Sequence, residues 1–404
     1  MTSEAARFGS LYLNMTRPAG RFRSLFQPGS ALRGMLGVLL LFIVVRAALA
    51  IWTWGVRQAF PDTFPGDVTD LYKGVLLETN PWLEPWQRWD TPQYQAIAGR
   101  GYAAFETALF TPPLYPFLMR IAGPFFGGDT LAFGLFISGL AALLGLVGLY
   151  QMARFEFGND QDALRAALFF AVFPTAVFLY TAYSESLFLA AGILCLYFTR
   201  RENWILTGLF GALAALTRMP GYLLVFVLAY ASWKAWRQGD RRCWIAVTLT
   251  GLGAVAYPAY VWLGLHRPPT DILAALNARG GMLTFPGLNL VEAARRIFSG
   301  QLVAENVIEL GFSLVFIVLT IFIWKRLPRI YGVYAVTLMV FFLTRIGSPQ
   351  PLVSMARYLL EIFPAFLLLA IWGRNAWVHR LILYLSWLGL LYFSAQFAIW
   401  GWVG

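Results

Sequence analysis

Long apolar runs separated by short charged segments dominate this chain of 404 residues. A helix needs about 20 apolar residues to cross a bilayer, and several runs reach or approach that length. Because hydrocarbon offers the backbone no hydrogen-bond partner, such runs must form helices. Apolar residues make up 59% of the sequence and charged residues 13%, a balance foreign to soluble domains. The sequence therefore predicts an all-α, multi-pass membrane protein.

We expect one domain over residues 1–404, built as a bundle of about eleven transmembrane helices. Pro174 and Pro258 fall inside two of the spans and predict kinks there. Spans 186–199 and 204–217 are shorter than a bilayer crossing, which predicts tilted or partly inserted helices. The predicted spans are 31–54, 130–152, 164–182, 186–199, 204–217, 220–236, 243–265, 304–324, 331–345, 357–373 and 380–401.

Basic residues predict the orientation of the bundle. They recur in short clusters in every second loop, as in Arg200–Arg201, Arg241–Arg242 and Lys325–Arg326. Loops rich in Lys and Arg stay in the cytoplasm. We therefore expect an inner-membrane protein whose amino-terminal segment 1–30 is cytoplasmic. The clustering between apolar runs also argues against nucleic acid as a partner, despite the net charge of +11.

Two longer segments, 56–130 and 266–303, are expected on the non-cytoplasmic face. Frequent prolines predict that the first consists of short amphipathic helices on the membrane surface, with an extended return at Thr111–Pro116. Acidic residues gather in this first outer segment: Asp62, Asp67, Asp70, Glu78, Glu84, Asp90, Glu106 and Asp129. The acids make it the candidate catalytic loop.

Asp90 is the acid whose surroundings are most distinctive, because it stands at the membrane boundary in the stretch Arg88–Tyr94. An ionised carboxylate beside hydrocarbon is costly unless it has a partner or a function. Trp82, Trp86 and Trp89 flank it and are typical of an aromatic belt at headgroup level. Two interpretations remain: a catalytic carboxylate, or a solvated acid beside aromatic anchors.

The motif around Asp90 resembles a known family. Trp89–Asp90 with Tyr94 and Gly101–Tyr102, followed by Pro113–Pro116, is similar to the first outer loop of PIG-V-type mannosyltransferases, within the C-type glycosyltransferase superfamily. More matches to the family follow in family order, so that the resemblance covers about residues 85 to 365 and the chain looks like a bacterial-like member. They are Phe173–Phe178, Tyr183–Phe188, Ala214–Arg218 with Gly221, and Ser354–Tyr358 with Phe363–Pro364.

This resemblance implies a membrane enzyme that transfers a sugar, typically mannose, from a polyprenyl-phosphate donor at the outer face. The acceptor would be a glycolipid, a polysaccharide or a protein. An inverting transfer needs one carboxylate to take the proton of the acceptor hydroxyl, and the lipid phosphate leaves without a general acid. Asp90 is the expected base. Glu185, on an outer turn, is expected to orient the acceptor or to help hold a divalent cation, although it also fits a solvated acid.

The leaving phosphate calls for fixed cations, and two arginines at outer helix ends, Arg218 and Arg357, are expected to contact it. Each also fits a simple interfacial anchor. The full set of predicted substrate-binding residues is Arg357, Arg218, Tyr94, Tyr358, Arg345 and His266. Arg279, Arg295 and Arg296 fit lipid headgroups better than an anionic acceptor.

Two other functions stay open: a transporter or lipid flippase, and a non-catalytic membrane subunit. A transporter predicts ionisable residues at the bilayer midplane and repeated halves, whereas this chain concentrates its acids in an outer segment. Two cysteines and two histidines exclude a metal site built on thiolates or imidazoles. No cofactor is predicted, and a divalent cation held by carboxylates stays possible.

Overall fold

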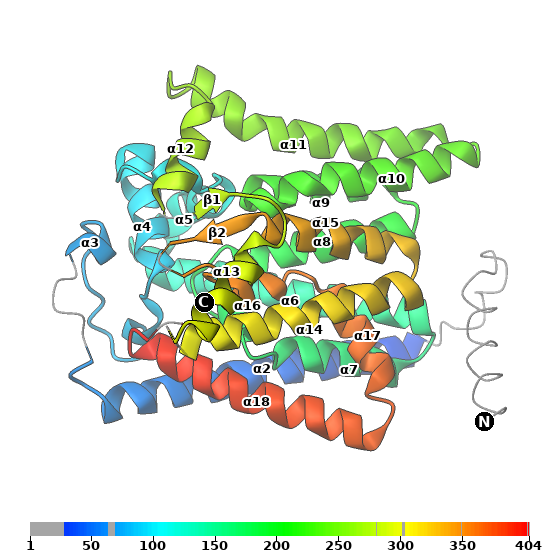
Figure 1. The fold of residues 1–404 in the computed structure, drawn as a ribbon, viewed down its shortest axis with the longest axis horizontal. Helices are drawn as coiled ribbons and strands as arrows, with labels where there is room; N and C mark the ends of the chain where they lie inside the picture. The colour runs from blue at the N-terminus through cyan, green and yellow to red at the C-terminus, as the bar shows by residue number, and fades with distance from the viewer. Residues whose placement is uncertain are drawn as a thin grey trace.

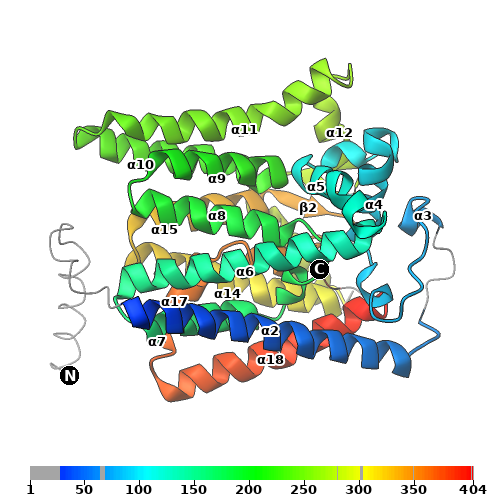
Figure 2. The same ribbon diagram turned by 180° about the vertical axis from the view of Figure 1, so that it is seen from behind.

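The computed structural model describes residues 28–63, 69–279, 281–300, 304–348, 350–401 and 403. Most of the predicted cytoplasmic segment 1–30, and Asp67 in the first outer segment, therefore lie outside the described residues. The described part is mostly helical, and its longer helices run side by side along the bundle (Figures 1 and 2).

Five helices in the described part are long and apolar enough to cross a membrane. They are α2 (Pro28–Ala59), α6 (Thr130–Phe157), α11 (Trp244–Leu263), α14 (Ala304–Arg326) and α18 (Ala376–Ala398). Shorter helices pack between them: α7 (Asp160–Ala171), α8 (Glu185–Arg200), α9 (Trp204–Thr217), α10 (Leu224–Arg237) and α15 (Arg329–Leu343). These helices indicate an integral membrane protein, while the count of eleven spans stays a prediction.

Two of the predicted spans are not continuous helices. In span 164–182, α7 ends at Ala171 and Pro174 follows it, so the expected kink is instead a helix end. A proline cannot extend a helix without clashing with the carbonyl four residues earlier. Span 357–373 is divided into α16 (Met355–Leu359) and α17 (Pro364–Trp372). Pro258, in contrast, lies inside α11 as predicted.

The two outer segments meet at one end of the bundle (Figure 1). The first holds α3 (Thr69–Tyr72), α4 (Asp90–Arg100) and α5 (Leu114–Ala122), so Leu114 begins a helix where an extended return was expected. The second holds α12 (Thr270–Ala278) and α13 (Leu288–Phe298). Between these two helices, β1 (Gly281–Leu283) pairs antiparallel with β2 (Arg345–Gly347), which the sequence did not predict.

A buried arginine attaches the first outer segment to the last helix. Arg88 has no exposed side-chain surface, and its Nε donates to the carbonyl of Ala398 at 3.2 Å. Its Nη2 lies 2.5 Å from Glu84 Oε1, and the guanidinium stacks on Trp400 at 4.9 Å. A buried charge is tolerated when it is paired and hydrogen-bonded in this way. Arg88 therefore fixes the start of α4, which carries Asp90.

Candidate active site

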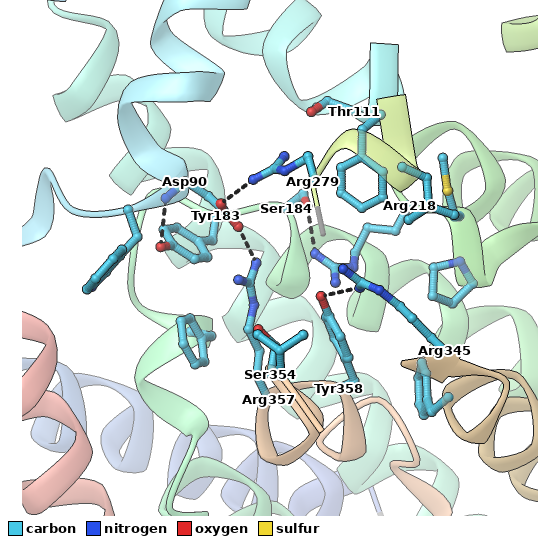
Figure 3. Close-up of a pocket in the computed structure, with 18 of the residues that line it drawn as sticks. Asp90, Thr111, Tyr183, Ser184, Arg218, Arg279, Arg345, Ser354, Arg357 and Tyr358 are labelled. Carbon is cyan, nitrogen blue, oxygen red and sulfur yellow. Dashed lines mark hydrogen bonds and ion pairs between the residues drawn. The ribbon is translucent and has the colours of Figure 1, made fainter. Parts of the chain in front are cut away.

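A cavity of about 280 Å³ lies where the outer segments cover the helix bundle (Figure 3). Its polar wall is strongly cationic. Among the described residues that line it, Asp90 is the single carboxylate. Four arginines and two of the predicted tyrosines face the same cavity: Arg218, Arg279, Arg345, Arg357, Tyr94 and Tyr358.

Asp90 occupies the first position of α4, where the helix dipole favours negative charge. The preceding residue, Trp89, has a φ of 51°, a left-handed conformation that costs a non-glycine residue energy. The backbone N–H of Asp90 donates to the Tyr183 hydroxyl at 3.0 Å. That hydroxyl in turn donates to the carbonyl of Arg88 at 3.3 Å. The turn that presents Asp90 is thus held from both sides.

Two arginines hold the carboxylate of Asp90. Arg357 Nη2 lies 2.8 Å from Oδ2, and Arg279 Nη2 donates to Oδ1 at 3.1 Å (Figure 3). Burial opposes ionisation of Asp90, but the two positive charges outweigh it and lower the pKa of Asp90 to about 2. Its side chain is still 21% exposed. Asp90 is therefore an ionised, accessible acceptor of protons.

Glu185 is the first residue of α8 and lies beneath the cavity. Its side chain has no exposed surface and does not line the cavity, so the predicted contact with an acceptor does not fit its position. Two guanidiniums, those of Arg218 and Arg357, contact the same oxygen, Oε1. Oε2 is buried without a hydrogen-bond partner among the described residues. Glu185 is placed to hold the arginines.

Arg218 follows the end of α9 and reaches the cavity from below. Pro220 prevents α9 from continuing, and Gly221 lets the chain fold back, because a Cβ there would lie 2.2 Å from the carbonyl of Ala214. Arg218 Nη1 lies 2.8 Å from Glu185 Oε1, and its Nε lies 3.0 Å from Glu361 Oε1. Arg218 is therefore shared between two fully buried carboxylates.

Arg357 lies on the short helix α16, which other parts of the bundle hold in place. The backbone N–H of Ala356 donates to Glu309 Oε2 of α14 at 2.5 Å. Thr175, in the turn after α7, donates its hydroxyl to the carbonyl of Ala356 at 3.0 Å. The Arg357 guanidinium stacks on Tyr183 at 4.7 Å from the ring centre. These contacts fix the position of α16 and the orientation of the Arg357 guanidinium.

Arg345 is the cavity arginine that differs from the rest. It belongs to β2, and its Nη1 donates to the Tyr358 hydroxyl at 2.9 Å (Figure 3). Among the described residues no carboxylate lies within ion-pair distance of it, and its Nε is buried without a hydrogen-bond partner. A cation on a cavity wall without a counter-charge is suited to bind an anion.

Of the other predicted binding residues, Tyr94 and Tyr358 line the cavity and His266 does not. Tyr94 lines the cavity and its hydroxyl bonds to the Ser184 hydroxyl at 2.8 Å. Tyr358 also lines it, between Arg345 and Arg357. His266 does not: it is exposed in the loop after α11 and is absent from the cavity wall, so its predicted contact with phosphate does not fit the structure.

The described residues hold no group of three or more His, Cys, Asp or Glu side chains that could bind a metal ion. The acids at the site, Asp90, Glu185 and Glu361, each lie against an arginine. A cation at Glu185 would lie close to the positive charges of Arg218 and Arg357, so the arrangement does not suit a divalent ion there.

Two charged residues of the site were missed by the sequence prediction. Glu361 lies one helical turn after Arg357 inside an apolar run, and an acid in such a run is a signal of function or pairing. Arg279, which the prediction linked to lipid headgroups, instead caps the end of α12 and pairs with Asp90. No feature of the sequence around Arg279 predicts its pairing with Asp90.

Sequence comparison gives matches to mannosyltransferases. The family model for dolichyl-phosphate-mannose-protein mannosyltransferases matches residues 111–262, which is less than half of the chain and includes Arg218 but not Asp90. GPI mannosyltransferase 2 of Yarrowia lipolytica is 24% identical over 233 residues, which are 57% of this chain and 63% of that protein. The resemblance inferred from the motifs is therefore confirmed: the chain is similar to C-type glycosyltransferases.

Solved structures show a looser likeness. The apo structure of ArnT from Cupriavidus metallidurans has a TM-score of 0.48 at 18% identity, covering 82% of this chain and 61% of that one. The oligosaccharyltransferase AglB from Archaeoglobus fulgidus, in complex with an inhibitory peptide and a dolichol-phosphate, has a TM-score of 0.39 at 11% identity, covering 89% and 55%. Both scores are too low to assign the fold.

Proposed function

We propose that this chain is an inverting glycosyltransferase that moves a sugar, mannose in the first instance, from a polyprenyl phosphate to a hydroxyl acceptor. The observation that carries the proposal is the cavity itself. It combines one ionised carboxylate, Asp90, with four arginines, among the described residues, at the end where the outer segments gather. The mannosyltransferases matched in sequence support the choice of sugar.

In the proposed reaction the acceptor oxygen attacks the anomeric carbon while Asp90 takes the hydroxyl proton. The bond from that carbon to the phosphate oxygen breaks, and the phosphate leaves with one more negative charge than the donor carried. Arg345, which lacks a carboxylate partner among the described residues, is suited to receive that charge. A positioned base contributes about 10²- to 10⁴-fold, and charge stabilisation must supply much of the rest.

The orientation of the site follows from the same proposal. The outer segments share one end of the bundle, and the loops with arginine clusters lie at the other (Figures 1 and 2). On the positive-inside rule we propose that the cavity opens on the non-cytoplasmic face, where a polar acceptor arrives from water while the isoprenoid remains in lipid. The proposed acceptor is a hydroxyl of a glycolipid, a polysaccharide or a protein.

The purified protein tests this function against a flippase or a non-catalytic subunit. It is given a radiolabelled polyprenyl-phosphate mannose with a panel of hydroxyl acceptors, and transfer of label is measured. Asp90→Asn is nearly isosteric and cannot take a proton, so it should lower turnover by about 100-fold or more. Absence of transfer to every acceptor, together with donor movement across vesicles, would establish the flippase instead.

A further inference from the structure

Six charged side chains at the site form one continuous series of alternating sign. Each lies within ion-pair distance of the next, and they come from five parts of the fold, since Glu361 follows Arg357 by one helical turn. We call this series the charge chain: Glu361, Arg218, Glu185, Arg357, Asp90 and Arg279, in that order. Its inner end is fully buried at Glu361, and its outer end reaches the cavity at Asp90 and Arg279.

In the middle of the charge chain, two arginines compete for one carboxylate oxygen. Arg218 and Arg357 both contact Oε1 of Glu185, and Oε2 has no hydrogen-bond partner among the described residues. Each arginine also has a second carboxylate: Glu361 for Arg218, and Asp90 for Arg357. When Arg218 pairs more strongly with Glu185, Glu185 attracts Arg357 less. Arg357 then pairs more strongly with Asp90.

Glu361 is the second carboxylate partner of Arg218 and therefore affects how strongly Arg218 pairs with Glu185. Its carboxylate lies 3.0 Å from Arg218 Nε, and neither of its oxygens has a directional hydrogen bond among the described residues. It therefore acts on Arg218 through charge. No part of Glu361 is exposed, so it does not contact a substrate. In a site of low dielectric, removing one buried charge redistributes its neighbours strongly.

We propose that Glu361 is a positioning residue for Asp90: it draws Arg218 away from Glu185, so that Glu185 keeps part of Arg357 and Asp90 is a stronger base than it would be if it alone paired with Arg357. This inference rests on the proposed role of Asp90 as the base. Without the charge of Glu361, Arg218 would pair with Glu185 alone and Arg357 would turn to Asp90. A carboxylate that is more strongly ion-paired is a weaker base.

The charged groups around Asp90 and Glu361 also indicate that Asp90 becomes a weaker base when Glu361 loses its charge. Asp90 faces Arg357 of α16 and Arg279 after α12, with Arg218 farther away and the Tyr183 hydroxyl at its backbone. Glu361 faces Arg218, Glu185 and Arg357, and its carbonyl accepts from the Tyr334 hydroxyl of α15 at 2.9 Å. Neutralising Glu361 leaves more positive charge around Asp90, which adds to the tighter pairing.

Glu361→Gln tests the proposal, with turnover and the donor KM measured at neutral pH, and with turnover measured again in the Asp90→Asn background. At neutral pH the variant should turn over about three- to tenfold more slowly, because its base is weaker. The donor KM should not change, and in the Asp90→Asn background, where no base is left to weaken, Glu361→Gln should lower turnover no further. Glu361→Asp keeps the charge and should restore most of the rate.

Glu156→Gln is the matched control, since Glu156 is a buried glutamate paired with an arginine, Arg200, outside the charge chain. Its turnover and donor KM should stay near those of wild type. Normal turnover of Glu361→Gln at neutral pH, or an equal further loss from it in the Asp90→Asn background, would overturn the positioning role. Asp90→Asn in the same assay separates the two hypotheses: if it retains turnover, the proposed base is wrong as well.

Discussion

Two groups of buried ion pairs lie at opposite ends of the helix bundle, and they differ in how completely their atoms are paired. At the end away from the cavity, Asp162 accepts Arg165 on Oδ1 at 2.5 Å, and Asn159 and Arg374 on Oδ2 at 2.8 Å and 2.6 Å. Glu156 there accepts both Arg200, at 2.6 Å, and the Tyr331 hydroxyl, at 2.7 Å.

At the cavity end the pairing is incomplete. Within the described part of the chain, Oε2 of Glu185, both carboxylate oxygens of Glu361 and Nε of Arg345 are buried without a hydrogen-bond partner. A fully paired network adds rigidity, whereas one with unmatched atoms costs stability and can exchange partners with a ligand. The comparison indicates structural ion pairs at one end and a reactive arrangement at the other.

The largest effect should come from removing the arginine that two carboxylates share. Arg357→Ala leaves Asp90 and Glu185 without their common cation, and breaking a buried ion pair costs about 3 to 5 kcal/mol. We expect a lower free energy of unfolding, measured by thermal unfolding in detergent. We also expect strongly reduced sugar transfer, measured with the labelled donor. Unchanged stability would show that Arg357 is an interfacial anchor, which the sequence left open.

A smaller effect, confined to the donor, should follow from Arg345→Ala. Arg345 has no carboxylate to leave unpaired among the described residues, so stability should change little. A charged hydrogen bond to phosphate contributes about 1.5 to 3 kcal/mol, so the KM for the donor should rise by about tenfold or more. Arg345→Lys should recover part of the loss. An unchanged donor KM would remove Arg345 from the phosphate site.

Much of the site was predictable because its residues sit in recognisable positions. Asp90, Tyr94, Arg218, Arg345, Arg357 and Tyr358 all face the cavity, as the motifs and the outer helix ends predicted. The reason is physical: a charge at a membrane boundary is costly, so it is conspicuous in an apolar sequence. The membrane class followed from composition in the same way.

What the sequence could not show depends on contacts between distant segments. Arg279 reaches Asp90 across 189 positions, and no local pattern encodes that contact. Glu185 looked like a turn acid, yet the bundle buries it beneath two arginines. The strands β1 and β2 have three residues each, too few for an alternating pattern to appear. Tertiary packing decided each of these outcomes.

The central claim is that Asp90 acts as a base, whereas Asp162, another aspartate with two arginine partners, is structural. It is tested most directly by measuring turnover and thermal stability of Asp90→Asn and Asp162→Asn side by side. Asp162→Asn weakens charged hydrogen bonds far from the cavity, so it should lose about 1.5 to 3 kcal/mol of stability and keep near-normal turnover per folded molecule. Asp90→Asn should lose a similar amount of stability, because Asp90 also has two arginine partners, but its turnover per folded molecule should fall by about 100-fold. Near-normal turnover in a well-folded Asp90→Asn protein would contradict the account.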